Sequence, residues 1–355
     1  MAMVVGVALL FVYVFTHRVS TGTDTVTTRP PDIVAELDGP SGNGPEGLLV
    51  LVGGGSPAVL DTHTGDLTPL PGLPTAPGDR AVLQPVGDGV LATVSSDRAS
   101  RALLVRRGTA VPLGDVVAAV PTRSGDIALV TQGNGSTTVR LRAPDGALRP
   151  PWSVRGLGVP VRDTVGGFLL SRVLTTGSSG GELLLVDART GAARRTLGTG
   201  RVVLAATDRL VAHLPGSCRA DCRVTVSDLA TGKDRQLPAV SGAPAAGGAF
   251  SPDGEMLALS VPGSFDGGES PRGGFVTVLD LVDAQWSVVP GVLTPAAQQA
   301  GVDWSPDGRL LVVAVWRSDR GLIGLWSPDR PGDPPVVLRT QPPGDRTSRI
   351  ATAEA

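Results

Sequence analysis

A short motif that occurs twice in the last third of the chain constrains the fold more than any other feature. Phe250-Ser251-Pro252-Asp253-Gly254 precedes the apolar run Met256–Val261, and Trp304-Ser305-Pro306-Asp307-Gly308 precedes Leu310–Trp316. Proline fixes φ for a turn, an aspartate side chain can bond to nearby backbone, and glycine accepts a positive φ. An apolar run after such a turn is typical of a strand buried on both faces. Each copy therefore predicts a tight structural turn followed by a buried strand, and such a unit needs neighbours to bury it.

A second turn motif, Asp-x-x-Thr-Gly, extends the repeat towards the N-terminus. It occurs at residues 61–65, 187–191 and 228–232, with weaker copies at 107–108, 144–146, 280–284 and 331–332. The glycines at positions 65, 108, 146, 191 and 232 are separated by 43, 38, 45 and 41 residues. This spacing is close to the 40–45 residues of a four-stranded propeller blade.

An apolar strand is predicted to open each repeat. Its seven copies are Leu48–Val52, Val90–Val94, Ile127–Val130, Phe168–Leu170, Leu210–Leu214, Met256–Val261 and Leu310–Val315. The sequence thus predicts an all-β chain, a seven-bladed β-propeller of four-stranded blades over residues 33–341. Two domains are disfavoured because the repeat runs through the middle of the chain. For ring closure, Ile33–Leu37 is expected to be either the innermost strand of the first blade or an outer strand of the last.

The aromatic-Ser-Pro-Asp-Gly turn and its apolar strand resemble the WD40-like repeat of TolB-type β-propellers, which occur in many bacterial extracytoplasmic proteins. The resemblance is specific over residues 248–340, whereas only the turn and strand pattern remains over residues 45–240. It implies a propeller scaffold used mostly for protein–protein contact. It implies no catalytic residue, because the shared motif is a turn.

The N-terminus is apolar from Met1 to Thr16, and its first charged side chain is Arg18. We expect residues 1–18 to form a single transmembrane helix that anchors the protein, in preference to a cleaved signal peptide or a buried soluble helix. Residues 19–32 are polar and are expected to be a flexible linker, and residues 342–355 a disordered tail. Arg18 after the apolar run favours a cytoplasmic propeller by the positive-inside rule, which conflicts with the cysteines.

The only two cysteines, Cys218 and Cys222, lie in one predicted loop between two strands. An even pair in a loop, behind a membrane-targeting segment, favours a disulfide in an oxidising compartment. The alternatives are two inert or redox-active thiols, or a metal site that also uses His213 and Asp221. The disulfide interpretation predicts a cell-membrane protein with its propeller on the extracytoplasmic side.

The longest insertion in the repeat runs from Pro262 to Gly274. It contains Asp266, Glu269 and Arg272 among glycines, and long loops on propeller faces often carry binding functions. It is a candidate partner-contact loop, with a passive insertion or a Ca²⁺ site as the alternatives.

The charge pattern and the motifs limit the function. The net charge is −2, Lys233 is the only lysine, and no basic stripe predicts a nucleic-acid partner. No Gly-Lys-Ser/Thr loop occurs, and the one Gly-x-Ser-x-Gly match, at residues 177–181, is not followed by the helical pattern that a nucleophile elbow requires, so neither a catalytic residue nor a cofactor or metal is predicted. The expected function is a non-catalytic interaction or sensing module on a membrane anchor, whose partner is another envelope protein, a peptide or a small ligand. The alternative is a propeller enzyme of the lyase or glycoside hydrolase type, with acids, His or Arg at one mouth of the central channel.

Overall fold

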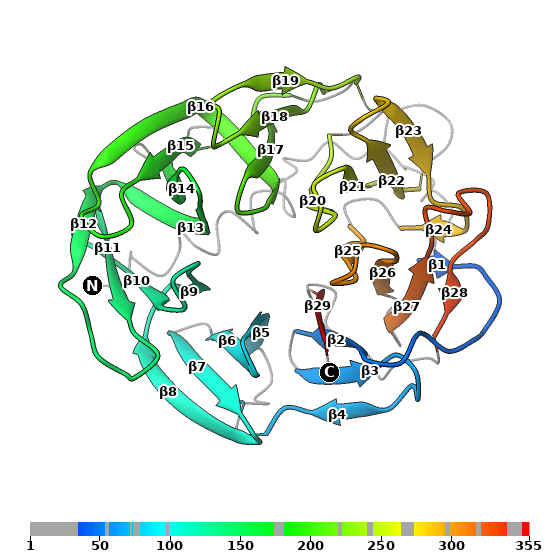
Figure 1. The fold of residues 1–355 in the computed structure, drawn as a ribbon, viewed down its shortest axis with the longest axis horizontal. Helices are drawn as coiled ribbons and strands as arrows, with labels where there is room; N and C mark the ends of the chain where they lie inside the picture. The colour runs from blue at the N-terminus through cyan, green and yellow to red at the C-terminus, as the bar shows by residue number, and fades with distance from the viewer. Residues whose placement is uncertain are drawn as a thin grey trace, which may run out of the picture.

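The strands form sheets arranged in a ring, as seen in a computed structural model (Figure 1). The structure describes residues 35–53, 57–71, 73, 79–96, 99–173, 181–218, 222–239, 244–263, 273–294, 299–316, 321–338 and 350–354. These residues form strands and turns and contain no helix. Each sheet runs outwards from a central axis, which is the arrangement of a β-propeller.

Five of the sheets have four strands, which are named in order from the innermost strand outwards. They are β29 (Ile350–Glu354), β2 (Leu48–Val52), β3 (Ala58–Asp61) and β4 (Leu67–Pro69); β5 (Arg80–Val86), β6 (Gly89–Ser95), β7 (Ser100–Arg106) and β8 (Thr109–Asp115); β9 (Ala118–Pro121), β10 (Ile127–Gly133), β11 (Ser136–Arg142) and β12 (Trp152–Arg155); β20 (Gly247–Phe250), β21 (Met256–Val261), β22 (Phe275–Asp280) and β23 (Gln285–Val288); β25 (Gly301–Trp304), β26 (Leu311–Trp316), β27 (Gly321–Trp326) and β28 (Val336–Val337).

A sixth sheet has seven strands because one long strand takes part in two halves of it. Its members are β13 (Leu157–Thr164), β14 (Gly167–Val173), β15 (Gly181–Val186), β16 (Ala193–Ala206), β17 (Leu210–Pro215), β18 (Thr225–Asp228) and β19 (Asp234–Gln236). The first part of β16 pairs with β15 and its second part with β17, and the two pairings meet at Arg201. Gly198 and Gly200 have φ values of 153° and 60°, which allow the strand to bend between its two partners.

The seven predicted apolar strands all exist, but none opens its repeat: six are the second strand of their sheet, and the seventh follows the second part of β16 in the seven-stranded sheet. They lie in β2, β6, β10, β14, β17, β21 and β26. The second strand is covered by the neighbouring sheets on both faces, and every residue of β26 is buried. The innermost strands border the central axis and are less apolar, which is why the sequence pattern missed them. β20, for example, is half-buried over three of its four residues.

The ring closes through the C-terminal strand. Ile350–Glu354 pairs antiparallel with Leu48–Val52, so the end of the chain is the innermost strand of the first sheet. The prediction of a disordered tail over residues 342–355 is therefore wrong for residues 350–354, because the inner edge of β2 offers unpaired backbone groups that this strand satisfies. Of the segment Ile33–Leu37, residues 33 and 34 lie outside the described residues, and residues 35–37 take neither expected role. β1 (Glu36–Leu37) instead pairs with β24 (Val292–Leu293) in a separate two-stranded sheet.

The hydrophobic core lies between neighbouring sheets. Phe168 and Trp152, on adjacent sheets, pack edge to face with ring centroids 6.0 Å apart. The indole N–H of Trp152 donates to the carbonyl oxygen of Ala188 at 2.8 Å, and that of Trp304 donates to Ala249 at 3.1 Å, each across to a neighbouring sheet. Tryptophan therefore both fills the space between sheets and fixes how they sit against each other.

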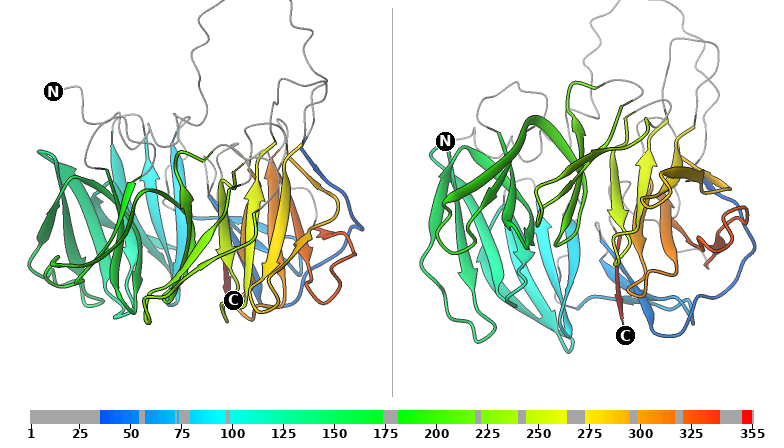
Figure 2. Two further views of the ribbon diagram at one scale, coloured as in Figure 1. Left: turned by 90° about the horizontal axis from the view of Figure 1, so that it is seen from above. Right: turned by 45° about the horizontal axis from the view of Figure 1, so that its top comes forward.

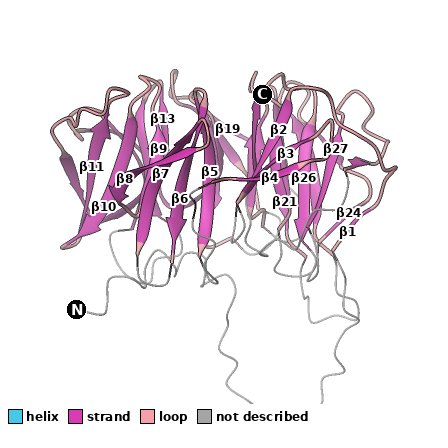
Figure 3. Cartoon of the chain, turned by 90° about the horizontal axis from the view of Figure 1, so that it is seen from below, coloured by secondary structure: helices cyan, strands magenta, loops and turns pink. Residues whose placement is uncertain are grey.

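The strands run between two faces of the ring (Figures 2 and 3). The turns that join a first strand to a second, or a third strand to a fourth, lie on one face, which we call the turn face. All of these turns are within the described residues. The predicted anchor at residues 1–18 and the linker at residues 19–32 lie outside them, and no helix in the described part of the chain is long and apolar enough to cross a membrane.

Candidate functional site

The two Ser-Pro-Asp-Gly turns have the same internal hydrogen bonds. The Ser251 hydroxyl donates to Asp253 at 2.5 Å and accepts the N–H of Met256 at 2.9 Å, and Gly254 has a φ of 76°. In the second copy, residues 305–308, the corresponding distances are 2.6 and 2.9 Å. The hydrogen bond from Ser305 is the main cause of a lowered pKa at Asp307. The polar groups of these turns thus serve the backbone and each other.

The two cysteines form a disulfide between the end of β17 and the start of β18. The Cα atoms of Cys218 and Cys222 are 5.9 Å apart, and the side chain of Cys222 is buried in the core between two sheets. Within the described residues no group of three or more His, Cys, Asp or Glu side chains is placed to hold a metal ion. The candidate partner residues Asp266, Glu269 and Arg272 lie outside the described residues.

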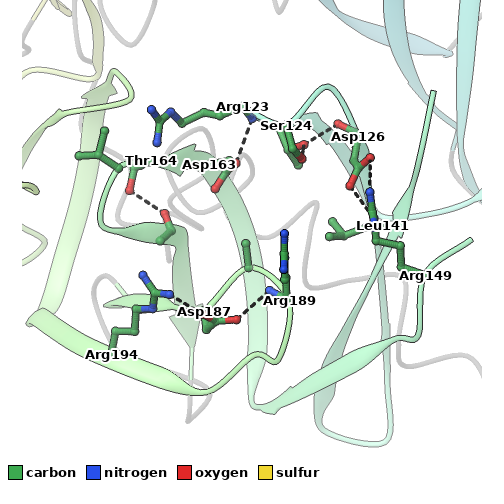
Figure 4. A pocket seen from close by; sticks show the side chains of 14 residues that line it. Arg123, Ser124, Asp126, Leu141, Arg149, Asp163, Thr164, Asp187, Arg189 and Arg194 are labelled. Carbon is green, nitrogen blue, oxygen red and sulfur yellow. Dashed lines mark hydrogen bonds and ion pairs between the residues drawn. The ribbon is translucent and has the colours of Figure 1, made fainter.

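A cleft of about 440 Å³ opens between the β9–β12 sheet and the β13–β16 half of the seven-stranded sheet (Figure 4). Its walls come from turns on the turn face, at residues 122–126, 163–167 and 187–189, together with Arg149 and Arg194. The charged side chains that line it are Arg123, Asp126, Arg149, Asp163, Asp187, Arg189 and Arg194. Because seven charged side chains line this cleft, it is the candidate functional site.

One wall of the cleft is a bidentate ion pair. Asp126, whose side chain is only 2% exposed, accepts hydrogen bonds from Arg149 Nε at 2.7 Å and from Arg149 Nη2 at 3.2 Å. The hydrogen bond and charge of Asp126 raise the pKa of Arg149. Two parallel N–H···O bonds hold a guanidinium in one plane, so this wall is rigid and already neutralised.

The opposite wall uses the Asp-x-x-Thr-Gly turn after β15. Asp187 accepts the backbone N–H groups of Arg189 and Thr190, each at 2.9 Å, and pairs with the guanidinium of Arg194. The hydrogen bond from Arg194 is the largest of the causes that hold the pKa of Asp187 well below its usual range. This carboxylate stays ionised at every physiological pH and is therefore unsuited to proton transfer.

Between these walls lie Asp163, Arg123 and Arg189. Asp163 Oδ2 accepts the backbone N–H of Arg123 at 2.9 Å, which joins the end of β13 to the β9–β10 turn. The side chain of Arg189 rises from its turn into the cleft (Figure 4), and it makes no hydrogen bond or ion pair with any described residue. The cleft therefore holds a guanidinium that the fold does not use.

The central axis is bordered by the innermost strands, some of which are rich in small apolar residues, such as Ala118–Pro121 and Gly247–Phe250. Others carry charged residues, among them Arg80 on β5, Arg162 on β13 and Asp303 on β25. Burial raises the pKa of Asp303, while hydrogen bonds from Thr352 and Trp304 and the charge of Arg162 oppose that shift. Its carboxylate is committed to those hydrogen bonds.

Sequence reasoning missed every charged residue of the cleft. The sequence marks Asp187 only as part of a turn, and the four arginines are scattered between positions 123 and 194. They come together because two neighbouring sheets place corresponding turns side by side. The sequence shows only that nearly all of the positive charge is carried by arginine. It does not indicate which arginines lie close together in the folded protein.

No protein-family model matches the chain, and no curated protein matches its sequence. Solved structures match it in fold. The periplasmic gluconolactonase of Pseudomonas aeruginosa has a TM-score of 0.57 at 16% identity, over 86% of this chain and 99% of that one. A putative 6-phosphogluconolactonase from Bacteroides fragilis has a TM-score of 0.53 at 17% identity, over 93% and 100%. TolB from Acinetobacter baumannii has a TM-score of 0.47 at 14% identity; the match covers 83% of this chain and 66% of TolB, so the chain spans about two thirds of that protein. The likeness at these identities is one of fold.

Proposed function

We propose that the protein is a non-catalytic binding module whose ligand site is the cleft between the β9–β12 sheet and strands β13–β16. The observation that carries this proposal is that the cleft's carboxylates already have partners. Asp126 is held by Arg149, Asp187 by Arg194 and two backbone N–H groups, and Asp163 by the backbone of Arg123. A general acid needs a carboxyl group that keeps its proton near neutral pH, whereas paired carboxylates and arginines are fixed charges suited to recognition.

The proposal includes a ring of seven four-stranded blades, with β16 counted both as the outer strand of one blade and as the inner strand of the next. The packing supports this count. Hydrophobic clusters fill seven interfaces between neighbouring blades, and the cluster that contains Val50 and Val312 joins the first blade to the last. A ring closed in this way leaves no long exposed sheet edge.

We further propose that the propeller lies outside the cytoplasm, tethered to the membrane by residues 1–18, where its partner is an envelope protein, a peptide or a small ligand. The disulfide between Cys218 and Cys222 supports an oxidising compartment. The test is labelling of intact cells with a membrane-impermeant maleimide. Labelling only after reduction is expected. Labelling only after lysis, without reductant, would contradict the extracytoplasmic location and favour the orientation that Arg18 suggests.

The second candidate is a propeller enzyme. The raised pKa of Asp303 near the positive charge of Arg162 on the inner strands favours it, as do the fold neighbours described as gluconolactonases. The discriminating experiment follows hydrolysis of gluconolactone above its uncatalysed rate. The binding proposal expects no turnover by the wild-type protein. Turnover that disappears in Asp303→Asn and persists in Asp163→Asn would establish the enzyme and overturn the binding proposal.

A further inference from the structure

We propose that the cleft binds a small anionic ligand, one that carries carboxylate or phosphate groups, through the guanidinium groups of Arg123 and Arg189. This inference rests on the proposed function, because it names the ligand class of the same cleft. Of the seven charged side chains there, Arg149 with Asp126 and Arg194 with Asp187 form two neutral pairs. The other three charged side chains, Arg123, Arg189 and Asp163, are available to contact a ligand.

Arg189 is not needed to build the turn from which it projects. The corresponding residue is His63 in the turn after β3 and Ala230 in the turn after β18. In all three turns the backbone N–H at this position donates to the preceding aspartate, at 2.8 Å for His63 and 2.9 Å for Arg189 and Ala230. The turn therefore forms with or without a guanidinium, and the side chain of Arg189 is left available for recognition.

The position of Arg123 is fixed by a hydrogen bond of its backbone, and its side chain makes only a weak ion pair. Its N–H donates to Asp163, which fixes the position of the turn. Its guanidinium lies 3.9 Å from Asp208, and both side chains are about half exposed, at 51% and 55%. Such a solvated pair contributes little free energy, so a ligand can replace it at small cost.

The remaining carboxylate restricts the ligand further. Asp163 Oδ1 has no hydrogen-bond partner among the described residues, since only Oδ2 is occupied. A carboxylate here repels an anion close to it and accepts a hydrogen bond from a hydroxyl or ammonium group. The ligand therefore places its anionic groups against the two arginines and a hydrogen-bond donor against Asp163. Planar guanidinium groups match the geometry of carboxylates and phosphates, and the cleft volume of about 440 Å³ suits a small molecule.

The test is isothermal titration calorimetry of the full-length chain with citrate and, separately, with inorganic phosphate, in a chloride buffer of low ionic strength. We expect at least one probe to bind, with an affinity that falls as sodium chloride is added. Arg123→Ala and Arg189→Ala are each expected to weaken binding by about ten- to a hundredfold, the usual effect of losing a charge-assisted hydrogen bond. Arg189→Ala reproduces the residue found at Ala230, so its fold should be intact.

Arg309→Ala is the matched control, because Arg309 lies on another turn of the turn face and its side chain is 83% exposed. It should bind like the wild-type protein. Binding of citrate alone identifies a carboxylate ligand, and binding of phosphate alone identifies a phosphorylated one. The inference is overturned if neither probe binds at millimolar concentrations, or if the Arg123→Ala/Arg189→Ala double variant binds as well as the wild type. Either of these negative outcomes would overturn the ligand class proposed here. Neither would show that the protein is an enzyme, because only the lactone assay tests that.

Discussion

The carboxylate of Asp303 on β25 holds Thr352 on β29, the strand that closes the ring. The backbone N–H of Thr352 donates to Asp303 Oδ2 at 2.7 Å, and its hydroxyl lies 3.2 Å from the same oxygen and also contacts the carbonyl oxygen of Trp304. β25 is the innermost strand of one sheet and β29 that of the next. The two residues therefore link neighbouring sheets where the two ends of the propeller meet, in addition to the backbone pairing between β29 and β2.

Removing the hydroxyl of Thr352 tests this link. Thr352→Val keeps the shape and the backbone N–H but removes the buried hydroxyl that contacts both Asp303 Oδ2 and the carbonyl oxygen of Trp304. We expect the free energy of unfolding to fall by about 1–3 kcal/mol in urea denaturation. Thr138→Val is the control, since that hydroxyl bonds to Ser153 at an exposed site. Equal losses in the two variants would contradict a special role for the ring-closing contact.

His213 should make the fold sensitive to acid. Its side chain is 1% exposed on β17, and burial, with the charge of Arg201 adding to it, lowers its pKa from 6.5 to about 4, while Asp234 opposes this shift. Because the folded pKa lies below the unfolded value, the contribution to stability is complete above pH 6.5 and is lost as the pH falls towards 4. The free energy of unfolding should fall by up to about 1.4 kcal/mol per pH unit across this window.

The pH dependence is measured by urea denaturation between pH 7 and pH 4. His213 Nε2 lies 3.1 Å from the Ser227 hydroxyl, and His213 Nδ1 has no partner among the described residues. The double variant His213→Leu/Ser227→Ala removes both polar groups together, which avoids leaving one of them unpaired. Its stability should vary less with pH over this window. An unchanged pH profile would show that His213 does not carry the effect.

The disulfide is expected to stabilise the fold only modestly. Cys218 and Cys222 are four residues apart, and closing so short a loop contributes about 2 kcal/mol in the chain-entropy model. Cys218→Ser should lower the melting temperature and leave the circular dichroism spectrum of the strands intact. Reductant should lower the melting temperature of the wild type and leave that of the variant unchanged. Complete unfolding of the variant would mean that the bond holds the sheet itself.

Ala284 offers a stabilising substitution. It occupies the position that is Gly65, Gly191 and Gly232 in the three Asp-x-x-Thr-Gly turns, and it has a φ of 59°, which L-residues other than glycine rarely adopt. Ala284→Gly should raise the free energy of unfolding by about 1 kcal/mol, because relief of the strain exceeds the added entropy of the unfolded chain.

The reverse change at a matched position is the control for Ala284. Gly232 has a φ of 76°, and Gly232→Ala should be destabilising because an added Cβ would take the same strained conformation. Thermal melts of the two variants and the wild type provide the comparison. If Ala284→Gly is destabilising, the turn after β22 does not carry the strain inferred from its backbone.

Much of the fold was predictable because the features that specify it are local. Ser251 and Asp253 hydrogen-bond within the same few residues of chain, and Gly254 supplies the φ that the turn requires. Continuous apolar strands such as Met256–Val261 followed from burial on both faces. Such signals lie within a short window of the chain, and they placed seven strands and their turns correctly. The disulfide was also predictable, because only two cysteines are present and they lie in one loop.

The candidate site could not be predicted in the same way. Arg123 and Arg189 belong to turns of different sheets, and nothing near either residue in the sequence marks it as a binding group. Arg189 occupies the position that is His63 and Ala230 in the other copies of its turn. The sequence alone therefore gives no reason to expect a function for its side chain. Only the packing of the two sheets gives it a cleft to face.

The sequence by itself determined the local structure of this protein, the turns, the buried second strands and the cysteine pair, because each depends on backbone preferences and side chains close together in the chain. The tertiary structure decided which strand closes the ring and where charge gathers. Ile350–Glu354 reads as a polar tail, and becomes a strand only because the edge of β2 offers it hydrogen-bond partners. The arginine cleft likewise exists only because two sheets bring distant turns together, and contacts between residues far apart in sequence leave no local pattern from which to infer them.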